Sequence, residues 1–454
     1  MKDSWLWWKK DDIETERRQL ADEGRDTSEV NGEFDRLLAP DVPDDAAFQE
    51  AANALLDKAS LLPTRRDYPY DEPCGLDEIR ARRPAAPRPP APDSSGVSRQ
   101  SRIAGAWLGR CAGCLLGKPV EGIRSPAMRA LLDRAGCEEI PDYLWRLPGV
   151  SDADYRQLGL ASLPAWRDTA FMPEDDDTNY TIANMALVKA KGLGFSPADV
   201  ADFWMANIPI LRTCTAERAA YRNFVNNVEP RRSASFRNPY REWIGAQIRA
   251  DFFGYAALGK PGLAAELAWR DASVSHVKNG MYGEMWVAAM LAGAGGAADA
   301  GRVLEIGLGE IPANCRLAEG VRDVMVWRTA GEPYAGAVRR IHRRWNENKA
   351  HDWCHVISNA QIVAAALLYG EGDFEKAVTR AVYPCFDTDC NGATVGSIMG
   401  MMLGAEALPP KWTGVMRDTI HSGIAGYHVC GISRLGEEMF KLHATSEQSQ
   451  RNGG

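Results

Sequence analysis

Glycine recurs at every fourth position in two distant segments of the chain, SRIAGAWLGRCAGCLLGKPVEG (101–122) and DTDCNGATVGSIMGMMLGA (387–405). The first stripe consists of Gly105, Gly109, Gly113 and Gly117, and the second of Gly392, Gly396, Gly400 and Gly404. A step of four residues turns an α-helix by about 400°, so each stripe follows one slowly drifting face. Each interior glycine costs a helix about 1 kcal/mol relative to alanine, so such stripes are tolerable only where helices pack closely. We predict that both stripes lie in the core and that at least one packs closely on another helix.

Most of the sequence after about residue 98 also has a helical pattern. Segments such as GEMWVAAMLAGA (283–294) and DFEKAVTRAVYP (373–384) carry apolar residues at intervals of three and four, which is typical of helices with a buried face. No run of alternating β-branched residues is long enough to indicate a sheet. The chain is therefore predicted to be all-α, with one compact multi-helix domain.

Three regions of the chain differ in composition. Residues 1–97 form a polar, charge-rich N-terminal extension that ends in the proline-rich segment RPAAPRPPAPDSSG (83–96), which we expect to be an extended linker. Residues 98–445 form the helical domain, and residues 446–454 are predicted to be a disordered tail. The extension could cover a cleft, pack on the helical body or mediate assembly.

The charge and the apolar segments restrict the classes of partner. The formal net charge is −8 at pH 7 and no arginine-rich patch is present, so a nucleic-acid partner is not expected. The most apolar run, residues 285–298, is too short to span a bilayer, and the N-terminus lacks the apolar core of a signal peptide. The ten cysteines are then expected to be reduced thiols. We predict a cytoplasmic protein without a membrane partner; its oligomeric state stays open.

Five aspartates stand directly before helical segments. Asp175, Asp176 and Asp177 lie within PEDDDTNYT, and Asp387 and Asp389 precede the second glycine stripe. Acids at a helix N-terminus cap the first turn and interact favourably with the helix dipole, which is the simplest interpretation of each cluster alone. Capping needs only one carboxylate, however, and adjacent aspartates repel one another. A hard divalent cation with oxygen ligands would relieve this repulsion, so the two clusters together predict a cation site.

Three separated motifs, taken together and in this order, resemble the ADP-ribosylglycohydrolase family. They are GAWLGRCAGCLLGKPVEG (105–122), which ends in Pro-x-Glu, DDDTNYT (175–181) and DTDCNGATVGSIMGMMLGA (387–405). SHVKNG (275–280) is similar, more weakly, to a segment that lines the substrate cleft in this family. The likeness covers roughly residues 100–410. It implies an all-α fold and a hydrolase that cleaves a glycosidic bond of an ADP-ribosylated substrate.

The resemblance also implies a binuclear Mg²⁺ centre and assigns residues to it. The implied metal ligands are Asp175, Asp176, Asp177, Asp387 and Asp389. Glu121 matches a glutamate beside the metals that positions or activates the substrate, and Glu121 and Asp387 are the predicted catalytic residues. The predicted substrate-binding residues are Gly245, His276, Asn279 and Gly280. Of these, Gly245 lies in the segment WIGAQIR, whose backbone amides could bind a diphosphate.

The sequence departs from the family pattern at three positions near the implied site. Asp175 stands where the family often has threonine, Cys390 where it commonly has threonine, and Cys114 where it often has aspartate. The additional charge of Asp175 leaves open a smaller riboside or nucleoside-like glycoside as the substrate. The thiol of Cys390, a poor ligand for Mg²⁺, leaves open a non-catalytic ADP-ribose-binding protein.

Overall fold

The computed structural model describes residues 3–85 and 96–452, with side chains up to residue 442. The first helices are α1 (Lys10–Asp22), α2 (Asn31–Leu38), α3 (Ala46–Ala59) and α4 (Leu76–Arg82). The body begins with α5 (Arg99–Gly117), α6 (Ser125–Ala135), α7 (Asp152–Gln157), α8 (Asp176–Lys191), α9 (Pro197–Asn207) and α10 (Thr215–Val225). It continues with α11 (Asp251–Ala256), α12 (Pro261–Ala272), α13 (Lys278–Gly293), α14 (Ala300–Leu308), α15 (Arg316–Thr329) and α16 (Tyr334–Arg344). The last helices are α17 (Ala350–Cys354), α18 (Val356–Gly370), α19 (Phe374–Val382), α20 (Thr388–Leu403), α21 (Pro410–Thr413) and α22 (Ile432–Asn452).

The predicted all-α fold is confirmed, with one small addition. Strands β1 (Thr419–His421) and β2 (Val429–Gly431) pair antiparallel, with Ile420 opposite Cys430. Alternation needs more than three residues to be visible in a sequence, so this hairpin gave no strand signal. Within the described residues, none of the helices is long and apolar enough to cross a membrane.

The two glycine stripes pack on one another. A Cβ atom built on Gly109 would lie 2.1 Å from the carbonyl oxygen of Gly396, and one built on Gly396 would lie 2.1 Å from the carbonyl oxygen of Gly109. Gly105 faces Gly400 in the same way, as Gly113 faces Gly392. As the residue number rises by four along α5, the number of the facing glycine in α20 falls by four. The two helices are therefore antiparallel. The prediction of close packing is confirmed, and the backbones touch where any larger residue would separate them.

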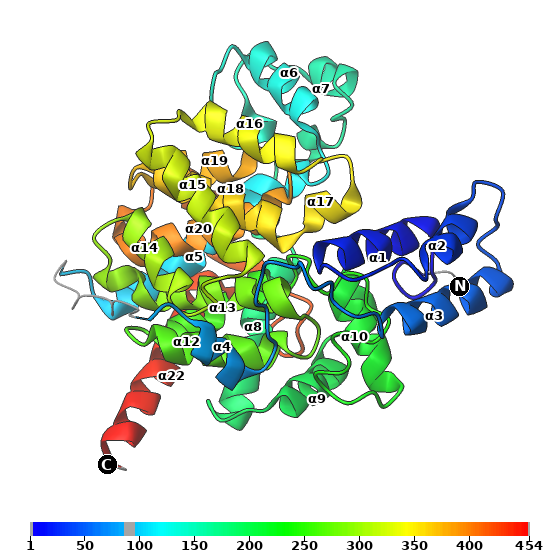
Figure 1. Ribbon diagram of the computed structural model, residues 1–454. Helices are drawn as coiled ribbons and strands as arrows, with labels where there is room; N and C mark the ends of the chain where they lie inside the picture. The colour runs from blue at the N-terminus through cyan, green and yellow to red at the C-terminus, as the bar shows by residue number, and fades with distance from the viewer. Residues whose placement is uncertain (1–2, 86–95, 453–454) are drawn as a thin grey trace.

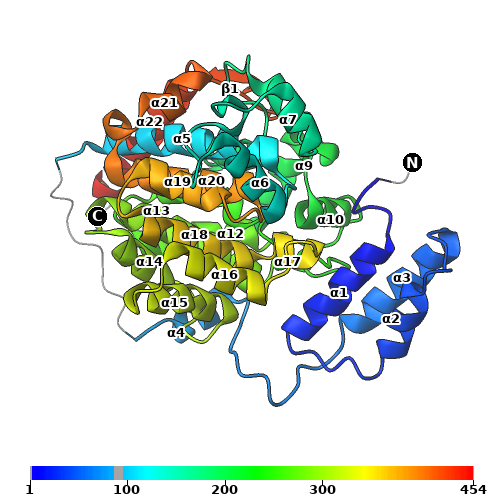
Figure 2. The same cartoon turned by 90° about the horizontal axis from the view of Figure 1, so that it is seen from above.

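The α5–α20 pair forms the centre of the body (Figure 2). Helices α19 and α20 lie between α5 on one side and α13 and α18 on the other, and α22 packs on α5. Every residue of α13 from Asn279 to Gly293 is buried. This explains why α13 and α20 are apolar around most of their circumference: they are covered by helices on several sides.

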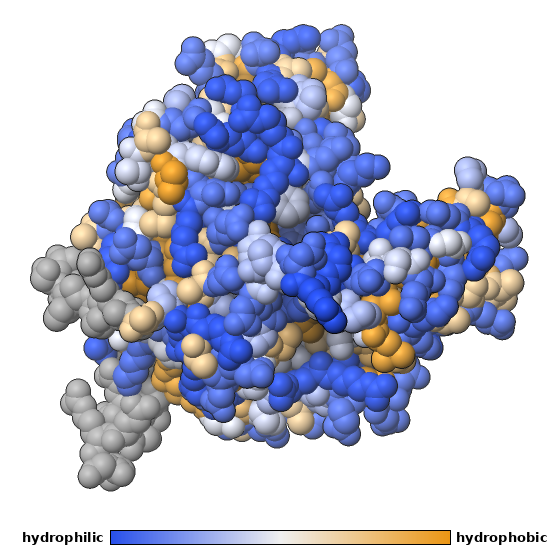
Figure 3. Space-filling model, in the orientation of Figure 1, coloured by the Kyte–Doolittle hydropathy of each residue, from blue (hydrophilic) through white to orange (hydrophobic). Residues whose placement is uncertain are grey.

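The N-terminal helices α1, α2 and α3 form a small bundle that projects from the body (Figure 1). The bundle has its own apolar core, which includes Trp8, Ile13, Leu20, Phe34 and Leu55. On the face seen in Figure 3 its outer surface is mostly hydrophilic, with a hydrophobic patch where the bundle meets the body. The extension is thus an ordered unit up to residue 85, although its boundary at residue 97 stays a prediction.

Buried charged groups join α1 to the body. The guanidinium of Arg241 lies 2.6 Å from Glu16 Oε2 and 2.7 Å from Glu23 Oε1, and all three side chains are buried. The hydroxyl of Tyr240 donates to Asp12 Oδ1 at 2.6 Å. A buried charge is stable only when its partner stays in hydrogen-bonding geometry. These contacts therefore fix the position of α1 against the body.

Two sequence predictions concern the ends of these regions. Most of the proline-rich linker at residues 83–96 lies outside the described residues. The disordered tail at residues 446–454 stays a prediction; α22 as described extends to Asn452. No glycine or proline precedes Gly453 in this stretch to end the helix. The domain boundaries themselves stay predictions.

Candidate active site

Three helix ends meet at one point of the body. The antiparallel register of the glycine stripes places Gly117, the last residue of α5, against the start of α20. A Cβ atom on Gly117 would lie 2.2 Å from the carbonyl oxygen of Thr388, and the Thr388 hydroxyl donates to the Gly117 carbonyl oxygen at 2.9 Å. The N-terminus of α8 completes the junction through Asp175. The segment that carries Glu121 therefore lies beside Asp387.

Asp175 is both a helix cap and a member of the acidic site. Its Oδ1 accepts from the backbone N–H of Asp177 at 2.9 Å, which caps α8. Its Oδ2 accepts from the Lys118 ammonium at 2.6 Å. Burial alone would raise the pKa of Asp175, but the charge and the hydrogen bond of Lys118 lower it overall. Lys118 therefore offsets one negative charge of the cluster.

Asp177 is held by one arginine and keeps one oxygen free. Its Oδ1 lies 3.2 Å from Arg110 Nη2, and Arg110 also pairs with Asp251 at 2.7 Å. These three side chains are buried. The other oxygen, Asp177 Oδ2, has no hydrogen-bond partner among the described residues. A buried carboxylate oxygen without a partner is costly, so this atom is suited to ligate a cation.

The second cluster has the same character. Ligand atoms of Asp387, Asp389 and Cys390 lie within 4.8 Å of one another, and all three residues are buried. Asp389 Oδ1 has no partner within the described part of the chain. The Cys354 thiol lies 3.9 Å from Asp387 Oδ2. Cys390 is thus placed beside two carboxylates, as its position in the motif implies.

The carboxylates raise one another's pKa values. Burial raises the pKa of Asp176, Asp177 and Asp389 well above the ordinary range, and neighbouring carboxylates add to the effect. Burial and the charges of Asp387 and Asp175 raise the pKa of Glu121 to about 7. The bare cluster therefore does not hold all of its negative charges at neutral pH. Hard divalent cations would stabilise those charges, so the donor set fits them.

Two of the predicted substrate-binding residues, Asn279 and Gly280, are buried in the interior. The Asn279 amide donates to Glu72 at 2.8 Å and to Glu242 at 3.0 Å, and all three residues are buried. A Cβ atom on Gly280 would lie 2.6 Å from the carbonyl oxygen of Arg241. The structure brings neither residue into the acidic cluster, and both support the packing around Arg241 and Glu242. Their contact with substrate stays a prediction.

His276 and Gly245 reach the site only through other side chains. His276 is fully buried, its Nδ1 lies 2.8 Å from the Ser275 hydroxyl, and burial holds its pKa well below the ordinary value. Arg249 donates to Ser275 at 3.1 Å and pairs with Glu217 at 2.7 Å. A Cβ atom on Gly245 would lie 2.2 Å from Glu217 Oε1. Glu217 in turn acts on the pKa of Asp176, so Gly245 is one side chain from the cluster.

The sequence did not reveal the two positively charged side chains of the site, Lys118 and Arg110. Lys118 stands between the last glycine of the first stripe and Pro119, a position that could have marked it. Arg110 lies inside the glycine helix next to Gly109, and a charged residue there resembles a surface position. Only the packing of α5 against α8 shows that Arg110 is buried beneath Asp177.

A pocket of about 670 Å³ lies between α1, the segment after Glu121 and α17. Gly122 on its wall directly follows Glu121, and Trp353 directly precedes Cys354, the neighbour of Asp387. Consecutive Cα atoms are about 3.8 Å apart, so this wall of the pocket lies next to Glu121 and Cys354, while the carboxylates of the acidic site are not among the described residues that line it. Its volume is in the range of ordinary small-molecule pockets.

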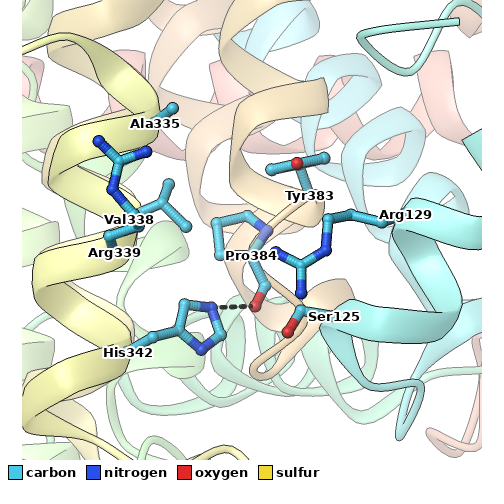
Figure 4. A pocket seen from close by; sticks show the side chains of 8 residues that line it. All are labelled: Ser125, Arg129, Ala335, Val338, Arg339, His342, Tyr383 and Pro384. Carbon is cyan, nitrogen blue, oxygen red and sulfur yellow. Dashed lines mark hydrogen bonds between the residues drawn. The ribbon is translucent and has the colours of Figure 1, made fainter.

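A smaller pocket of about 260 Å³ lies between α6, α16 and the segment after α19 (Figure 4). Arg129 and Arg339 lie on opposite sides of it. His342 Nε2 donates to the carbonyl oxygen of Pro384 at 3.0 Å. None of the predicted site residues is among the described residues that line this pocket, so it is separate from the acidic site.

Comparison with known proteins identifies the family of the chain. The family model for ADP-ribosylglycohydrolase matches residues 95–448. The chain therefore belongs to the ADP-ribosylglycohydrolase family, a family of glycoside hydrolases, which is contrary to the non-catalytic alternative. A comparison with curated proteins gives no match. A solved structure described as an ADP-ribosylglycohydrolase-related protein complex is similar over 76% of this chain and 96% of that chain, at 20% identity and a TM-score of 0.44.

Proposed function

We propose that this glycoside hydrolase uses two Mg²⁺ ions to cleave the bond between ribose and its acceptor in an ADP-ribosylated substrate. The observation that carries the proposal is the convergence of Glu121 and five aspartates at the ends of three helices, where their charges act on one another. The carboxylate oxygens without partners on Asp177 and Asp389 support it. Asp175, Asp176, Asp177, Asp387 and Asp389 would hold the cations.

The chain's own residues orient this donor set. Lys118 holds one oxygen of Asp175, Arg110 holds one oxygen of Asp177, and the Asn359 side-chain oxygen accepts from the backbone N–H of Asp387 at 3.2 Å. When bound, Mg²⁺ would polarise the ribose oxygens and lower the pKa of a water molecule. Fixed carboxylates reduce the reorganisation that such chemistry requires.

Glu121 is the proposed proton carrier. Its pKa of about 7 lies near neutral pH, where a carboxyl group can both accept and return a proton. It lies at the border between the buried aspartates and the 670 Å³ pocket, because Gly122 belongs to the pocket wall. From there it can take a proton from the attacking water or give one to the departing acceptor, while Asp387 orients the ribose side.

A smaller riboside is the second candidate substrate, because Asp175 adds a negative charge to the site. The contact between Lys118 and Asp175 favours the ADP-ribosyl substrate instead, since the ammonium offsets that charge. Thermal shift with ADP-ribose and with nucleosides, each with Mg²⁺, separates the two. A larger shift with nucleosides would favour the smaller riboside.

Calorimetry tests the proposal as a whole. The protein should bind Mg²⁺, and more tightly with ADP-ribose present, and it should release ADP-ribose from arginine-linked or serine-linked peptides. Asp387→Ala and Asp389→Ala should each reduce Mg²⁺ affinity and turnover by about 100-fold or more while the circular dichroism spectrum is kept. Asp373→Ala is the matched control, since Asp373 caps α19 at an exposed position. A protein that binds no divalent cation in either condition refutes the proposal.

A further inference from the structure

The pocket beside the acidic site has a wall that comes from the N-terminal extension. Asp11, Glu14, Thr15 and Arg18 line the pocket from α1, and their spacing of three and four places them on one helix face. Of these, Asp11, Glu14 and Arg18 are exposed. The neighbouring face of α1, with Asp12 and Glu16, binds the body. The helix therefore presents charged groups to the pocket, and of these Arg18 lies 3.9 Å from Asp352 Oδ1 on the facing wall.

This wall is fixed in place. Asp22 Oδ2 at the end of α1 lies 2.8 Å from His351 Nε2, and His351 itself lines the pocket. Trp243 Nε1 donates to His351 Nδ1 at 3.1 Å. Tryptophan only donates, so His351 carries its proton on Nε2 and donates it to Asp22. These bonds, added to those of Glu16 and Glu23 with Arg241, make α1 a rigid part of the pocket.

The charges of the pocket indicate what it can bind. Its lining contains three acidic and three basic side chains: Asp11, Glu14, Asp352, Arg18, Arg124 and Lys349. The Arg124 guanidinium lies 5.8 Å from the centre of the Trp353 ring, whose indole N–H has no hydrogen-bond partner among the described residues. Arginine and lysine side chains bind a diphosphate through charge-assisted hydrogen bonds, but in this lining the three basic side chains are matched by three acidic ones. A peptide with charged side chains of either sign can pair with it.

We propose that this pocket receives the peptide acceptor of the substrate and that the nucleotide lies on another side of the acidic site. The inference rests on the proposed function, because the ribose must lie at the carboxylates for its acceptor to reach the pocket. Glu14 and Arg18 of α1 then select acceptor sequences. The N-terminal extension acts as a specificity element.

The test compares two variants of α1 on two peptides and on ADP-ribose itself. Both peptides carry an ADP-ribosylated residue, which is flanked by acidic residues in the first peptide and by basic residues in the second. Each peptide is made in an arginine-linked and a serine-linked form. Arg18→Ala should raise KM about tenfold for the acidic peptide, and Glu14→Gln should raise KM about tenfold for the basic peptide. A tenfold change corresponds to the loss of about one charge-assisted hydrogen bond. The inhibition constant of ADP-ribose should not change.

Arg17→Ala is the matched control. Arg17 is the next residue on α1, but it pairs with Asp35 of α2 at 3.0 Å and does not line the pocket, so its KM values should equal those of the wild type.

Three outcomes overturn the inference. They are unchanged KM values in both variants, an equal loss of ADP-ribose affinity, and a wild-type protein that binds ADP-ribose but releases it from no peptide. A wild-type protein that binds no ADP-ribose contradicts the proposed function itself.

Discussion

Lys118 shows how one side chain adjusts the charge of the acidic site. The family motif around it led us to expect a ligand cluster with one aspartate too many, because Asp175 stands where a threonine is common. The ammonium of Lys118 takes up that difference by pairing with Asp175 at 2.6 Å. Asp175 adds one negative charge relative to the family motif, and Lys118 offsets it. The net charge of the site therefore stays close to that of the motif.

Replacing Lys118 by methionine should make the protein depend on divalent cations for its stability. Asp175 would then be a buried carboxylate without its cation, which should cost about 2 kcal/mol in the free energy of unfolding, since Lys118 is itself partly exposed. Urea unfolding with and without Mg²⁺ measures this. The variant should gain more from Mg²⁺ than the wild type does, and an equal gain would show that Lys118 does not neutralise the site. Lys411→Met, at an exposed pair with Glu375, is the control.

The binding of Mg²⁺ should release protons, and more of them below neutral pH. The pKa of Glu121 is raised from its ordinary 4.5 to about 7 without a metal, and a cation favours the ionised form. Calorimetry at pH 6 and pH 8 in buffers of different ionisation enthalpy should therefore show a larger release at pH 6 and a higher affinity at pH 8. Because ionisation is disfavoured in the folded state, this group makes the metal-free protein less stable as pH rises from 4.5 to about 7. A proton release that does not depend on pH would contradict this assignment.

At the scale of elements, the sequence predicted the glycine helices but not their pairing. Spacing of four marked both stripes, and the helix propensity cost indicated close packing. The register could not be predicted, because each glycine of one stripe could face any glycine of the other. It is decided by the surrounding side chains and by the contact of Gly117 with Thr388. That register is what places Glu121 beside Asp387.

Gly396→Ala should destabilise the protein although alanine favours a helix. The new Cβ would lie 2.1 Å from the Gly109 carbonyl oxygen, which is backbone and cannot turn aside. We expect a loss of about 3 kcal/mol or more, after the gain of about 1 kcal/mol in helix propensity. Gly32→Ala in α2 is the control, because a Cβ at Gly32 meets no atom within 4 Å, and its stability should be equal or higher. Thermal unfolding of both variants checks the prediction, and equal midpoints would refute it.

At the scale of the whole molecule, the docking of the N-terminal extension was the part that the sequence could least predict. Arg241, Glu16 and Glu23 are charged residues, which usually lie at the surface. Nothing in their spacing shows that they meet in the interior, since the contact joins segments that are far apart in the chain. The helical character of the body and the acidic clusters, by contrast, were visible as local patterns.

Arg241→Ala should loosen the extension. It removes the cation that pairs with Glu16 and Glu23, and leaving buried carboxylates without a partner costs about 3–5 kcal/mol. Hydrogen exchange of α1 amides should rise markedly while that of α20 stays close to the wild-type value. Arg237→Ala is the matched control: Arg237 also joins the body to the extension, through Asp57, but that pair is partly exposed and should contribute about 1 kcal/mol or less. Equal exchange in the two variants would contradict a fixed α1.

The pairing of α5 with α20 also determines when the molecule can acquire its site during synthesis. The two helices span Arg99–Gly117 and Thr388–Leu403, so nearly the whole body must be translated between them. At ordinary rates of translation α5 waits on the order of tens of seconds for its partner. A nascent chain in that interval already contains Asp175 and Glu121 but has no second cluster to complete a cation site. A product that terminates before Asp387 therefore lacks the second acidic cluster, and in such a product the glycine face of α5 has no α20 to cover it.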